Sequence, residues 1–482
     1  MDALFLSRMQ FAWLIAFHIL LPAFTVGLSC YVATLEVRYW LGKDETVRRL
    51  SAFWIKIFAI SFGMGVVSGI VMPFQFGTNW SRFTDATSNV VGALLAYEVV
   101  TAFFLESAFL GVLLFGRKLV PQWAHALSAV LVALGTVLSS FWILAVNSWM
   151  QTPAGYQIVD GRFFPLSLSA VIFTPSFPYR LAHTVSAFLI TTAFVVLAVG
   201  AYYLLRGAAR AESRIMMRMS LLFLALFVPL QIMLGDLHGL NTLQHQPAKV
   251  AAMEGIWETQ RGVAASLFAL PDAEAEKNHL EIAIPKLASI YLTHDPNGEV
   301  KGLKEWPRQD RPPVAVVYFA FRVMVGIGLL MLAIVLTGLL LWWRGRLFDT
   351  RWYLRACQVS GAFGFIAVVA GWTVTEVGRQ PWVVYGLMRT SEGVTPSLVR
   401  ISEGVTPSLT TLDVLISLAG YVLAYIIIFG GGFVLMRRLV RIGPAPAGAS
   451  ETVDHAARPM RPMSAVSNAD GQATLAGGSD VP

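Results

Sequence analysis

Long apolar runs joined by short polar connections make up most of the chain between Phe11 and Arg438. Each run reaches roughly 20 residues or more, which lets a helix with a rise of 1.5 Å per residue cross about 30 Å of hydrocarbon. The pattern therefore predicts an all-α polytopic membrane protein, a bundle of about nine transmembrane helices with one long outer loop. The predicted spans are 9–34, 54–76, 92–115, 125–146, 182–205, 217–235, 315–343, 355–376 and 412–436.

One long polar interruption, Leu237 to Pro313, differs from the other connections. We interpret it as a structureless insert, and inserts of this length inside a compact unit are usually functional. The predicted organisation is residues 1–236 with helices one to six, an outer loop 237–313, residues 314–440 with helices seven to nine, and a disordered cytoplasmic tail 441–482.

A helical pattern opens this loop. Pro247 suits a first helical turn, and Lys249, Glu254 and Glu258 punctuate the pattern. Its apolar stripe consists of Ala251, Ala252, Met253, Ile256 and Trp257. We predict a short amphipathic helix on the membrane surface, with its cation and carboxylates facing a polar group. The alternative is a solvated helix with no special role.

Composition agrees with a membrane protein, since 56% of the residues are hydrophobic and 13% charged, with a mean hydropathy of +0.63. The net charge of +7 therefore does not indicate a nucleic-acid partner. Two cysteines make no disulfide framework. The N-terminus lacks a basic region, and its apolar stretch is too long for a cleaved signal peptide, so we expect it to remain as the first span.

The basic residues orient the chain. Connections after the odd-numbered spans carry most of them, namely Arg38, Lys43, Arg48, Arg49, Arg117, Lys118, Arg206, Arg210, Arg214, Arg218, Arg344, Arg346, Arg351, Arg355, Arg437, Arg438 and Arg441. The positive-inside rule then predicts an outer N-terminus, an inner C-terminus and an outer position for the long loop. Residues 389–410 contain a tandem repeat of 11 residues, which we interpret as a duplication that lengthens an outer loop without chemistry of its own.

Ionisable side chains inside spans are costly, so each is a functional candidate. His18, His183, Glu98 and Glu376 all fall in the predicted outer half, beside the long loop. Pro22 cannot donate a helical hydrogen bond to the His18 carbonyl, so we predict a kink there. His125 lies away from this layer, and we interpret it as a plain interfacial histidine.

Glu98 and the deeper Glu106 share the third span. Eight residues at 100° each place them about 80° apart around an ideal helix and about 12 Å apart along it. This spacing favours a proton relay or cation path, with a hydroxyl such as Ser107 or Ser139, or water, between them. The alternative is that a carboxylate pairs with an arginine of a neighbouring helix.

Buried imidazoles and carboxylates without cysteine ligands suit haem better than a soft-metal or iron–sulfur site. From the residues alone, haem ligation and a protonation relay both stay open for each histidine.

Several motifs together resemble subunit I of the cytochrome bd family of quinol oxidases, up to about residue 440. They are His18, YEVVTAFFLES at 97–107, SFWILAVNSWMQTPAG at 140–155, AHTVSAF at 182–188, KVAAMEGIWETQ at 249–260, FRVMVGIG at 321–328 and GWTVTEVGRQPW at 371–382. The family fold is a helical bundle with three haems and an outer quinol-binding loop, which agrees with the predicted topology and assigns that role to residues 237–313.

The resemblance implies a cofactor set. His183 and Met324 would be the axial ligands of a low-spin haem b, near Arg322, and His18 and Glu376 would each ligate one of two high-spin haems. One of these would be haem b and the other haem d or a further haem b. Trp372 would pack beside them, and Arg379 would face a propionate, where its fork suits a carboxylate.

The resemblance also implies a reaction and partners. Lys249 and Glu254 match loop residues implicated in oxidation of ubiquinol or menaquinol, and the electrons would reduce O2 to water. The protein would lie in the bacterial inner membrane and generate proton motive force without pumping. A second subunit, and a small single-span subunit as a further candidate, would complete it. The loop is the short form and resembles the cyanide-insensitive branch.

Two rival functions remain open at this point. Intramembrane charges are also normal in ion-coupled transporters, although matching internal repeats and broken helices are not found here. A haem b membrane subunit that only relays electrons is the second rival.

Overall fold

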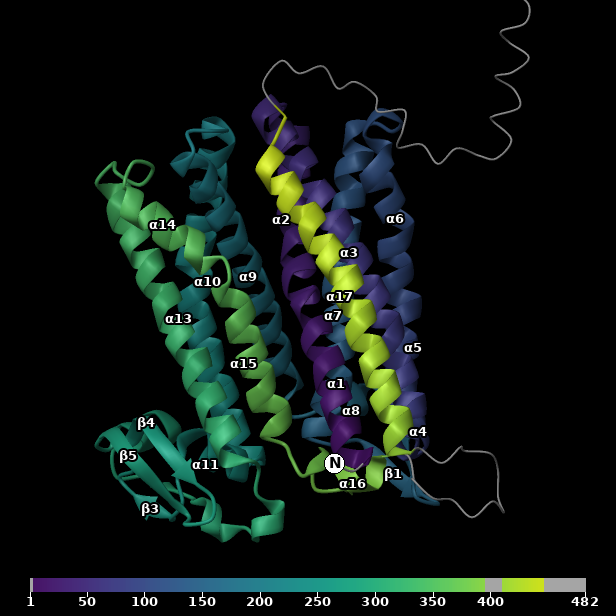
Figure 1. Cartoon of the computed structure of the whole chain (residues 1–482), viewed down its shortest axis with the longest axis vertical. Coiled ribbons are helices and arrows are strands. Elements are labelled where there is room, and N and C mark those ends of the chain that lie inside the picture. The colour runs from purple at the N-terminus through teal and green to yellow at the C-terminus, as the bar shows by residue number, and fades with distance from the viewer. Residues whose placement is uncertain (1–2, 395–409, 446–482) are drawn as a thin grey trace, which may run out of the picture. The chain divides into compact units, whose positions relative to one another are not determined.

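The computed structural model describes residues 3–394 and 410–445, in which helices predominate (Figure 1). Nine helical segments in this part of the chain are long and apolar enough to cross a membrane, which confirms the predicted polytopic all-α fold. They consist of α1 (Ala3–Leu20) with α2 (Pro22–Gly42), α3 (Glu45–Thr78), α4 (Ser81–Thr87) through α5 (Ala93–Glu98) to α6 (Phe104–Phe115), α7 (Gln122–Gln151), α9 (Phe177–Leu205), α10 (Arg210–His245), α13 (Val314–Trp343), α14 (Arg351–Ser360) with α15 (Phe363–Val377), and α17 (Thr411–Ile442).

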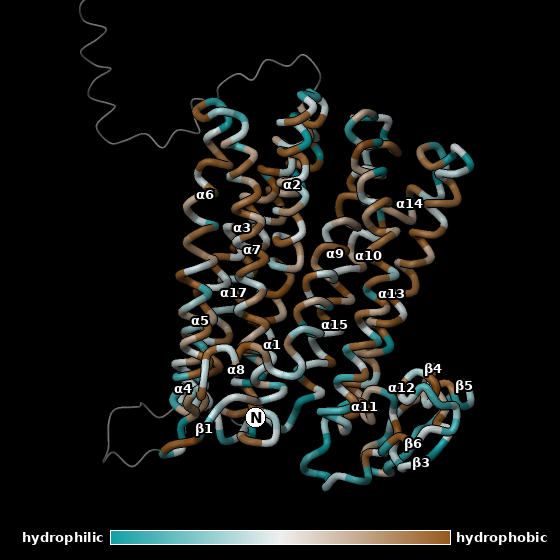
Figure 2. The backbone as a smooth tube through the Cα atoms, turned by 180° about the vertical axis from the view of Figure 1, so that it is seen from behind, coloured by the Kyte–Doolittle hydropathy of each residue, from teal (hydrophilic) through white to brown (hydrophobic). Residues whose placement is uncertain are grey.

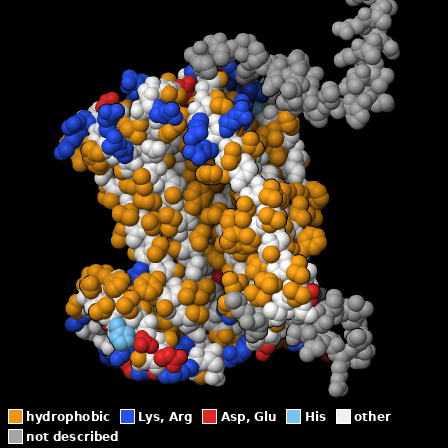
Figure 3. All heavy atoms as spheres, viewed as in Figure 1, with side chains coloured by type: hydrophobic (Ala, Val, Ile, Leu, Met, Phe, Trp, Pro, Cys, Tyr) orange, Lys and Arg blue, Asp and Glu red, His pale blue; other side chains and the backbone are white. Residues whose placement is uncertain are grey.

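The hydropathy of the chain follows this arrangement. Apolar residues dominate along the helices (Figure 2), and a band of hydrophobic side chains separates two charged ends (Figure 3). Lys and Arg gather at one end of the bundle, and the opposite end carries a lobe of short strands and helices. The bundle therefore has the surface expected of a multi-pass membrane protein.

The first span is broken at Leu21, between α1 and α2. The His18 carbonyl accepts a hydrogen bond from the Leu21 amide at 3.1 Å, and Pro22 begins the next helix. The predicted kink at Pro22 is confirmed, because proline has no amide hydrogen with which to continue the ladder.

The third span departs from ideal geometry. Two π-helical segments, η1 (Ser88–Gly92) and η2 (Val99–Phe103), interrupt it, and the second lies between Glu98 and Glu106. A π-helical turn contains more residues than an α-helical turn, so the offset of 80° calculated for an ideal helix is wrong here. Such turns are frequent at functional sites.

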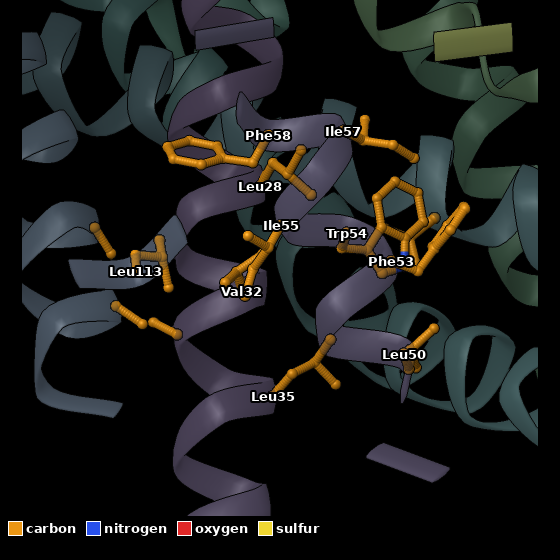
Figure 4. Packing of buried hydrophobic residues seen from close by; sticks show 14 of the residues in the cluster. Leu28, Val32, Leu35, Leu50, Phe53, Trp54, Ile55, Ile57, Phe58 and Leu113 are labelled. Atoms are coloured by element: carbon orange, nitrogen blue, oxygen red, sulfur yellow. The ribbon is translucent and has the colours of Figure 1, made fainter. Parts of the chain in front are cut away.

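Packing between the helices uses interlocked apolar side chains and small residues. Leu28 and Val32 of α2 pack among Trp54 and Phe58 of α3 (Figure 4). A Cβ at Gly27 would lie 2.4 Å from Oγ1 of Thr192, so α2 and α9 are in direct backbone-to-side-chain contact there. In lipid, where no hydrophobic force drives helices together, such close approach maximises van der Waals contact.

The polar interruption is not structureless, as the sequence interpretation had it. The helix α10 continues past residue 237 to His245, because backbone hydrogen bonds propagate a helix whatever the polarity of its side chains. The lobe then contains α11 (Pro247–Glu254), α12 (Leu287–Thr293) and the strands β3 (Gln260–Arg261), β4 (Ala265–Asp272), β5 (Lys277–Ile284) and β6 (Glu299–Val300). Strands β4 and β5 form an antiparallel hairpin.

The predicted surface helix is α11. A helix on the membrane surface and a solvated helix were the two alternatives, and both are wrong about its exposure. Seven of its eight residues are buried, including Lys249 and Glu254 at 2% exposure each. It ends at Gly255, whose φ of 70° suits a left-handed cap, so Ile256 and Trp257 follow the helix rather than belong to its stripe. The cation and the carboxylate therefore lie in the protein interior.

Smaller elements close the same end of the bundle. They are β1 (Tyr156–Val159), β2 (Arg162–Pro165), α8 (Leu168–Ile172), β7 (Trp382–Val384), β8 (Met388–Arg389) and α16 (Thr390–Gly393). Most of the tandem repeat, 395–409, and most of the predicted tail, 446–482, lie outside the described residues.

Candidate functional site

A cavity of about 1650 Å³ lies among the helices and extends to the lobe. It is lined mainly by apolar side chains from the membrane-spanning segments, with a minority of polar groups. All the site residues predicted from the sequence line it, namely His18, Glu98, Glu106, His183, Lys249, Glu254, Arg322, Met324, Trp372, Glu376 and Arg379. Residues separated by up to 361 positions in the sequence thus line one cavity.

His18 is held by the neighbouring helix α3. Its Nδ1 is 2.8 Å from Oγ of Ser68, and the ring packs against Gly69, where a Cβ would lie 3.4 Å from Cε1. A hydrogen bond at Nδ1 fixes the orientation of the ring and leaves Nε2 free to bind a ligand.

His183 projects from α9 towards α10. Its Nδ1 is buried without a hydrogen-bond partner among the described residues, and its carbonyl accepts a hydrogen bond of 3.1 Å from Gln231. Its ring lies 5.5 Å from the ring of His238, which the sequence analysis did not single out. The only signal for His238 was its place in the GDLHG run directly after the sixth predicted span.

Met324 and Trp372 come from adjacent helices, α13 and α15. A Cβ at Gly371 would lie 2.9 Å from the Met324 sulfur, so the thioether packs against the backbone beside Trp372. Trp372 in turn is four residues before Glu376, on the same side of α15. This places a thioether sulfur, an aromatic ring and a carboxylate along one wall of the cavity.

Glu376 sits in a network of polar side chains from four elements. Its Oε1 accepts a hydrogen bond of 2.7 Å from Asn147 and one of 3.3 Å from Gln151, and Arg379 donates at 2.5 Å to Oε2. Lys249 donates to Gln151 Oε1 at 2.7 Å, which links α11 to the same network. The motif at 140–155 carried both amides, but nothing in it indicated what they bind.

Three cations surround this network. Arg180 is 4% exposed and donates to Asn147 at 3.4 Å, and Arg379 is 5% exposed with Nε and Nη1 unpartnered in the described residues. Burial, aided by the Arg180 guanidinium, lowers the pKa of Lys249 well below its usual range. Buried donors of this kind suit the carboxylates of a bound group.

A second polar site lies where α11 meets α13. Arg322 donates to Glu254 at 2.8 Å, and its guanidinium lies 4.6 Å from the ring centre of Tyr318. Tyr318 also forms a 2.8 Å hydrogen bond with Ser266 of β4. Burial and the neighbouring Glu254 carboxylate raise the pKa of Tyr291 above its usual range.

Glu98 and Glu106 both face α7. Ser139 donates to Glu98 at 2.7 Å, and a Cβ at Gly135, one turn earlier, would lie 2.5 Å from Cγ of Glu106. Neither carboxylate has an arginine partner in the described residues, so the alternative of a pairing with a neighbouring arginine is not found. Ser107 is exposed and donates to the Phe103 carbonyl, which leaves Ser139 as the better intermediate hydroxyl.

His125 is not a plain interfacial histidine. It is 2% exposed, and its Nδ1 lies 2.9 Å from Glu36 Oε2. Glu36 is fully buried and also bonds Arg117 and Ser51. The sequence analysis missed this cluster, because Glu36 lies at the end of a helix that continues beyond the predicted span.

The residues present fit haem. Histidine nitrogens, a thioether and a carboxylate face a large apolar cavity, and buried guanidinium groups lie beside it. Among residues 3–394 and 410–445, no three His, Cys, Asp or Glu side chains gather to hold a bare metal ion. Haem needs only one or two protein ligands for each iron.

Known proteins resemble the chain over nearly its whole length. The family model for cytochrome bd terminal oxidase subunit I matches residues 6–444. The cytochrome bd ubiquinol oxidase subunit 1 of Bacillus subtilis is 38% identical over 408 residues, covering 82% of this chain and 87% of that protein. The cytochrome bd-II ubiquinol oxidase subunit 1 of Escherichia coli is 32% identical over 512 aligned positions, covering 92% and 97%. The solved bd oxidase of Geobacillus thermodenitrificans superimposes with a TM-score of 0.82 at 28% identity, over 92% of this chain and 99% of that one.

Proposed function

Because this chain belongs to the cytochrome bd terminal oxidase subunit I family, we propose that it is the catalytic subunit of a quinol:O2 oxidoreductase of the bacterial inner membrane. The observation that carries the proposal is the convergence of every predicted site residue on one cavity that joins the spans to the lobe. Neither rival function accounts for this set of ligand-type side chains in one apolar space.

His183 and Met324 would hold a low-spin haem b, and His18 and Glu376 would each hold one of two high-spin haems. The position of all four side chains at the cavity, and the His18–Ser68 hydrogen bond that leaves Nε2 of His18 free, support these assignments. When bound, the haem irons supply one-electron transfer and the reduction of O2. The second high-spin haem is haem d or a further haem b. Arg379, Arg180 and Lys249 would face the haem propionates as hydrogen-bond donors.

At the lobe, Glu254 and Arg322 would receive the quinol. The carboxylate is placed to accept a hydroxyl proton, and Arg322 orients it through its 2.8 Å hydrogen bond. Lys249, buried beside Glu376 and Gln151, would link this site to the propionate cluster. The substrate would be ubiquinol or menaquinol.

Protons for water would come from the other end of the bundle. Glu106 and then Glu98 would pass them along α7, with Ser139 as the hydroxyl at the second carboxylate. The concentration of Lys and Arg at the end opposite the lobe supports a cytoplasmic position for that end. Quinol protons would leave at the outer face, so charge separates without a pump.

A second membrane subunit completes the enzyme, as the numbering of the relatives as subunit 1 implies. A small single-span subunit is a further proposed partner. The exposed surface of α17 supports a partner, because only 11% of its most apolar window is buried within the described chain.

A reduced-minus-oxidised visible spectrum of the purified complex, with and without CO, tests the proposal. We expect a low-spin haem band and a CO-reactive component. A protein without haem would be a transporter, and a low-spin haem that does not react with CO would indicate an electron relay.

A further inference from the structure

The β4–β5 hairpin of the lobe exposes an unusual amount of apolar surface. Leu280 and Ile282 are 74% and 62% exposed, and neighbouring side chains on both strands are also open to the surroundings. The patch consists of Leu267, Phe268, Leu270, Leu280, Ile282 and Ile284. On a water-soluble surface, apolar side chains at this density mark an interaction site.

The backbone of the hairpin turns these side chains outward. The register shifts between Phe268 and Leu270, so that Leu280 and Glu281 lie opposite a single residue of β4. Leu280 adopts a φ of 50°, in the left-handed region that leucine rarely occupies. A bulge of this kind re-aims a side chain, and here it holds a leucine away from the protein.

The patch is continuous with a membrane-facing helix surface. Phe268 contacts Phe319 of α13, with ring centroids 6.5 Å apart. Phe319, Val316 and Val323 are exposed at helical spacing along α13, whose segment has the highest mean hydropathy of the nine, 2.7. In Figure 3 the hydrophobic side chains of the lobe lie on its side towards the bundle, and its charged groups lie on the far side.

The same hairpin borders the cavity. Ala265, Ser266 and Leu267 of β4 line it together with Glu254 and Arg322. Ser266 is buried and bonded to Tyr318, whereas Leu267 is 54% exposed, so the strand forms the wall between the apolar patch and the inner site. A molecule dissolved in the membrane would meet this wall before it meets Glu254.

We propose that the apolar face of the β4–β5 hairpin rests among the acyl chains of the outer leaflet, beside the entrance through which a lipid-dissolved quinol reaches Glu254 and Arg322. The occupant of the patch is phospholipid, because the surface continues the lipid-facing side of α13 without a break. This inference rests on the proposed function and adds the route by which its substrate arrives.

A photocrosslinking experiment identifies what touches the patch. Benzoylphenylalanine replaces Leu280 in the complete oxidase, reconstituted in nanodiscs of phosphatidylethanolamine and phosphatidylglycerol. Glu299, exposed on β6 of the same lobe, is the control position. We expect lipid adducts at 280 and none at 299 by mass spectrometry. Adducts to a second subunit or a second copy, or no adduct at 280, would overturn the inference.

A kinetic experiment tests the entrance. Leu280→Asp keeps the fold, since aspartate tolerates the left-handed conformation better than leucine. We expect KM for a long-tailed quinol in vesicles to rise about fivefold with little change in kcat, because a charge is costly in the leaflet. KM for a short-tailed, water-soluble quinol should not change. Ile158→Asp, the same change on the exposed β1 strand away from the cavity, should match the parent.

The variant Glu254→Gln distinguishes the inference about the hairpin from the proposed function on which it rests. If Leu280→Asp behaves as the parent with the long-tailed quinol while Glu254→Gln is slow, the hairpin inference fails and the proposed function stands. If Glu254→Gln is also as fast as the parent, the quinol site itself is misplaced.

Discussion

Two groups of buried charges occupy opposite ends of the bundle, and they differ in how their polar atoms are partnered. At the end away from the lobe, both oxygens of Glu36 are bonded, to Arg117, Ser51 and His125. The second ring nitrogen of His125 lies 3.1 Å from the Leu113 carbonyl. In this cluster only Nη1 of Arg117 lacks a partner in the described chain.

In the cavity, by contrast, several buried polar atoms have no hydrogen-bond partner among the described residues. There the titratable side chains with an atom that lacks a partner in the described residues are His183 at Nδ1, Glu106 at Oε1, Arg322 at Nε, and Arg379 at Nε and Nη1. Buried polar atoms are normally hydrogen-bonded, because an unsatisfied one costs about 1–3 kcal/mol. We therefore infer that the Glu36 cluster serves stability, whereas the unpartnered atoms of the cavity are available to the proposed cofactor, substrate and protons.

Replacing a proposed ligand should have the most severe consequence. In Met324→Leu, which conserves side-chain volume, we expect loss of the low-spin α-band and a drop in quinol oxidation of about a thousandfold, because the axial ligand sets the haem potential. Thermal stability should change little. Visible spectroscopy and O2 consumption check this. Met331→Leu, seven residues later on the same helix, is the control, and a full α-band in Met324→Leu would contradict the ligand assignment.

Glu36→Ala should act on stability instead of chemistry. It removes the partner of the buried His125 and of the half-buried Arg117, and breaking such a cluster costs about 3 kcal/mol. We expect a lower unfolding temperature and lower yield, with parent turnover per haem in the protein that remains folded. Glu45→Ala, an exposed partner of Arg48, should be near neutral. If the folded Glu36→Ala protein loses turnover, the Glu36 cluster takes part in the mechanism.

Glu106→Gln keeps size and hydrogen bonding but cannot carry a proton. We expect haem content near the parent and steady-state O2 consumption about a hundredfold lower, the scale of a lost proton-transfer group. Membrane potential generated in proteoliposomes should fall in parallel. Ser107→Ala, at an exposed hydroxyl one residue away, should behave as the parent. Normal potential in Glu106→Gln would exclude this path.

Glu254→Gln should slow quinol oxidation about tenfold, because the amide cannot accept the hydroxyl proton. Reduction of the haems by dithionite should be unchanged, and an artificial donor that bypasses the lobe should restore O2 turnover. Glu258→Gln, exposed four residues later, is the control. If Glu254→Gln oxidises quinol at the parent rate, α11 has a structural role and does not take part in quinol oxidation.

Glu276 extends the comparison to a half-buried carboxylate on the lobe. Hydrogen bonds from Arg311 and Arg308 hold its pKa below its ordinary value of 4.5. A carboxyl with a lowered folded pKa stabilises the protein above its unfolded pKa, and this stability is lost as the pH falls through the folded value. We expect the lobe to exchange amide hydrogens slightly faster near pH 4 than at pH 7 relative to its intrinsic rate, and Glu276→Gln to abolish that difference.

The spans and the ligand candidates were predictable from the sequence because both depend on local quantities. Apolar run length decides which segments can cross a bilayer, and Pro22 breaks its helix through its own missing amide hydrogen. His18 and Glu376 stood out because ionisable groups are rare in spans. The family motifs then assigned roles to them.

Tertiary structure alone decided which of these groups meet. Glu254 and Arg322 are 68 residues apart in the chain and become partners only when α11 is buried against α13. The same holds for Glu36 with His125, and for Glu376 with Asn147. Such pairs depend on the packing of distant helices, which leaves no periodic trace along the chain. The exposed hairpin could not be predicted from the sequence for a related reason. Its polar tip and its bulge obscure the alternation of apolar and polar residues by which strands are recognised.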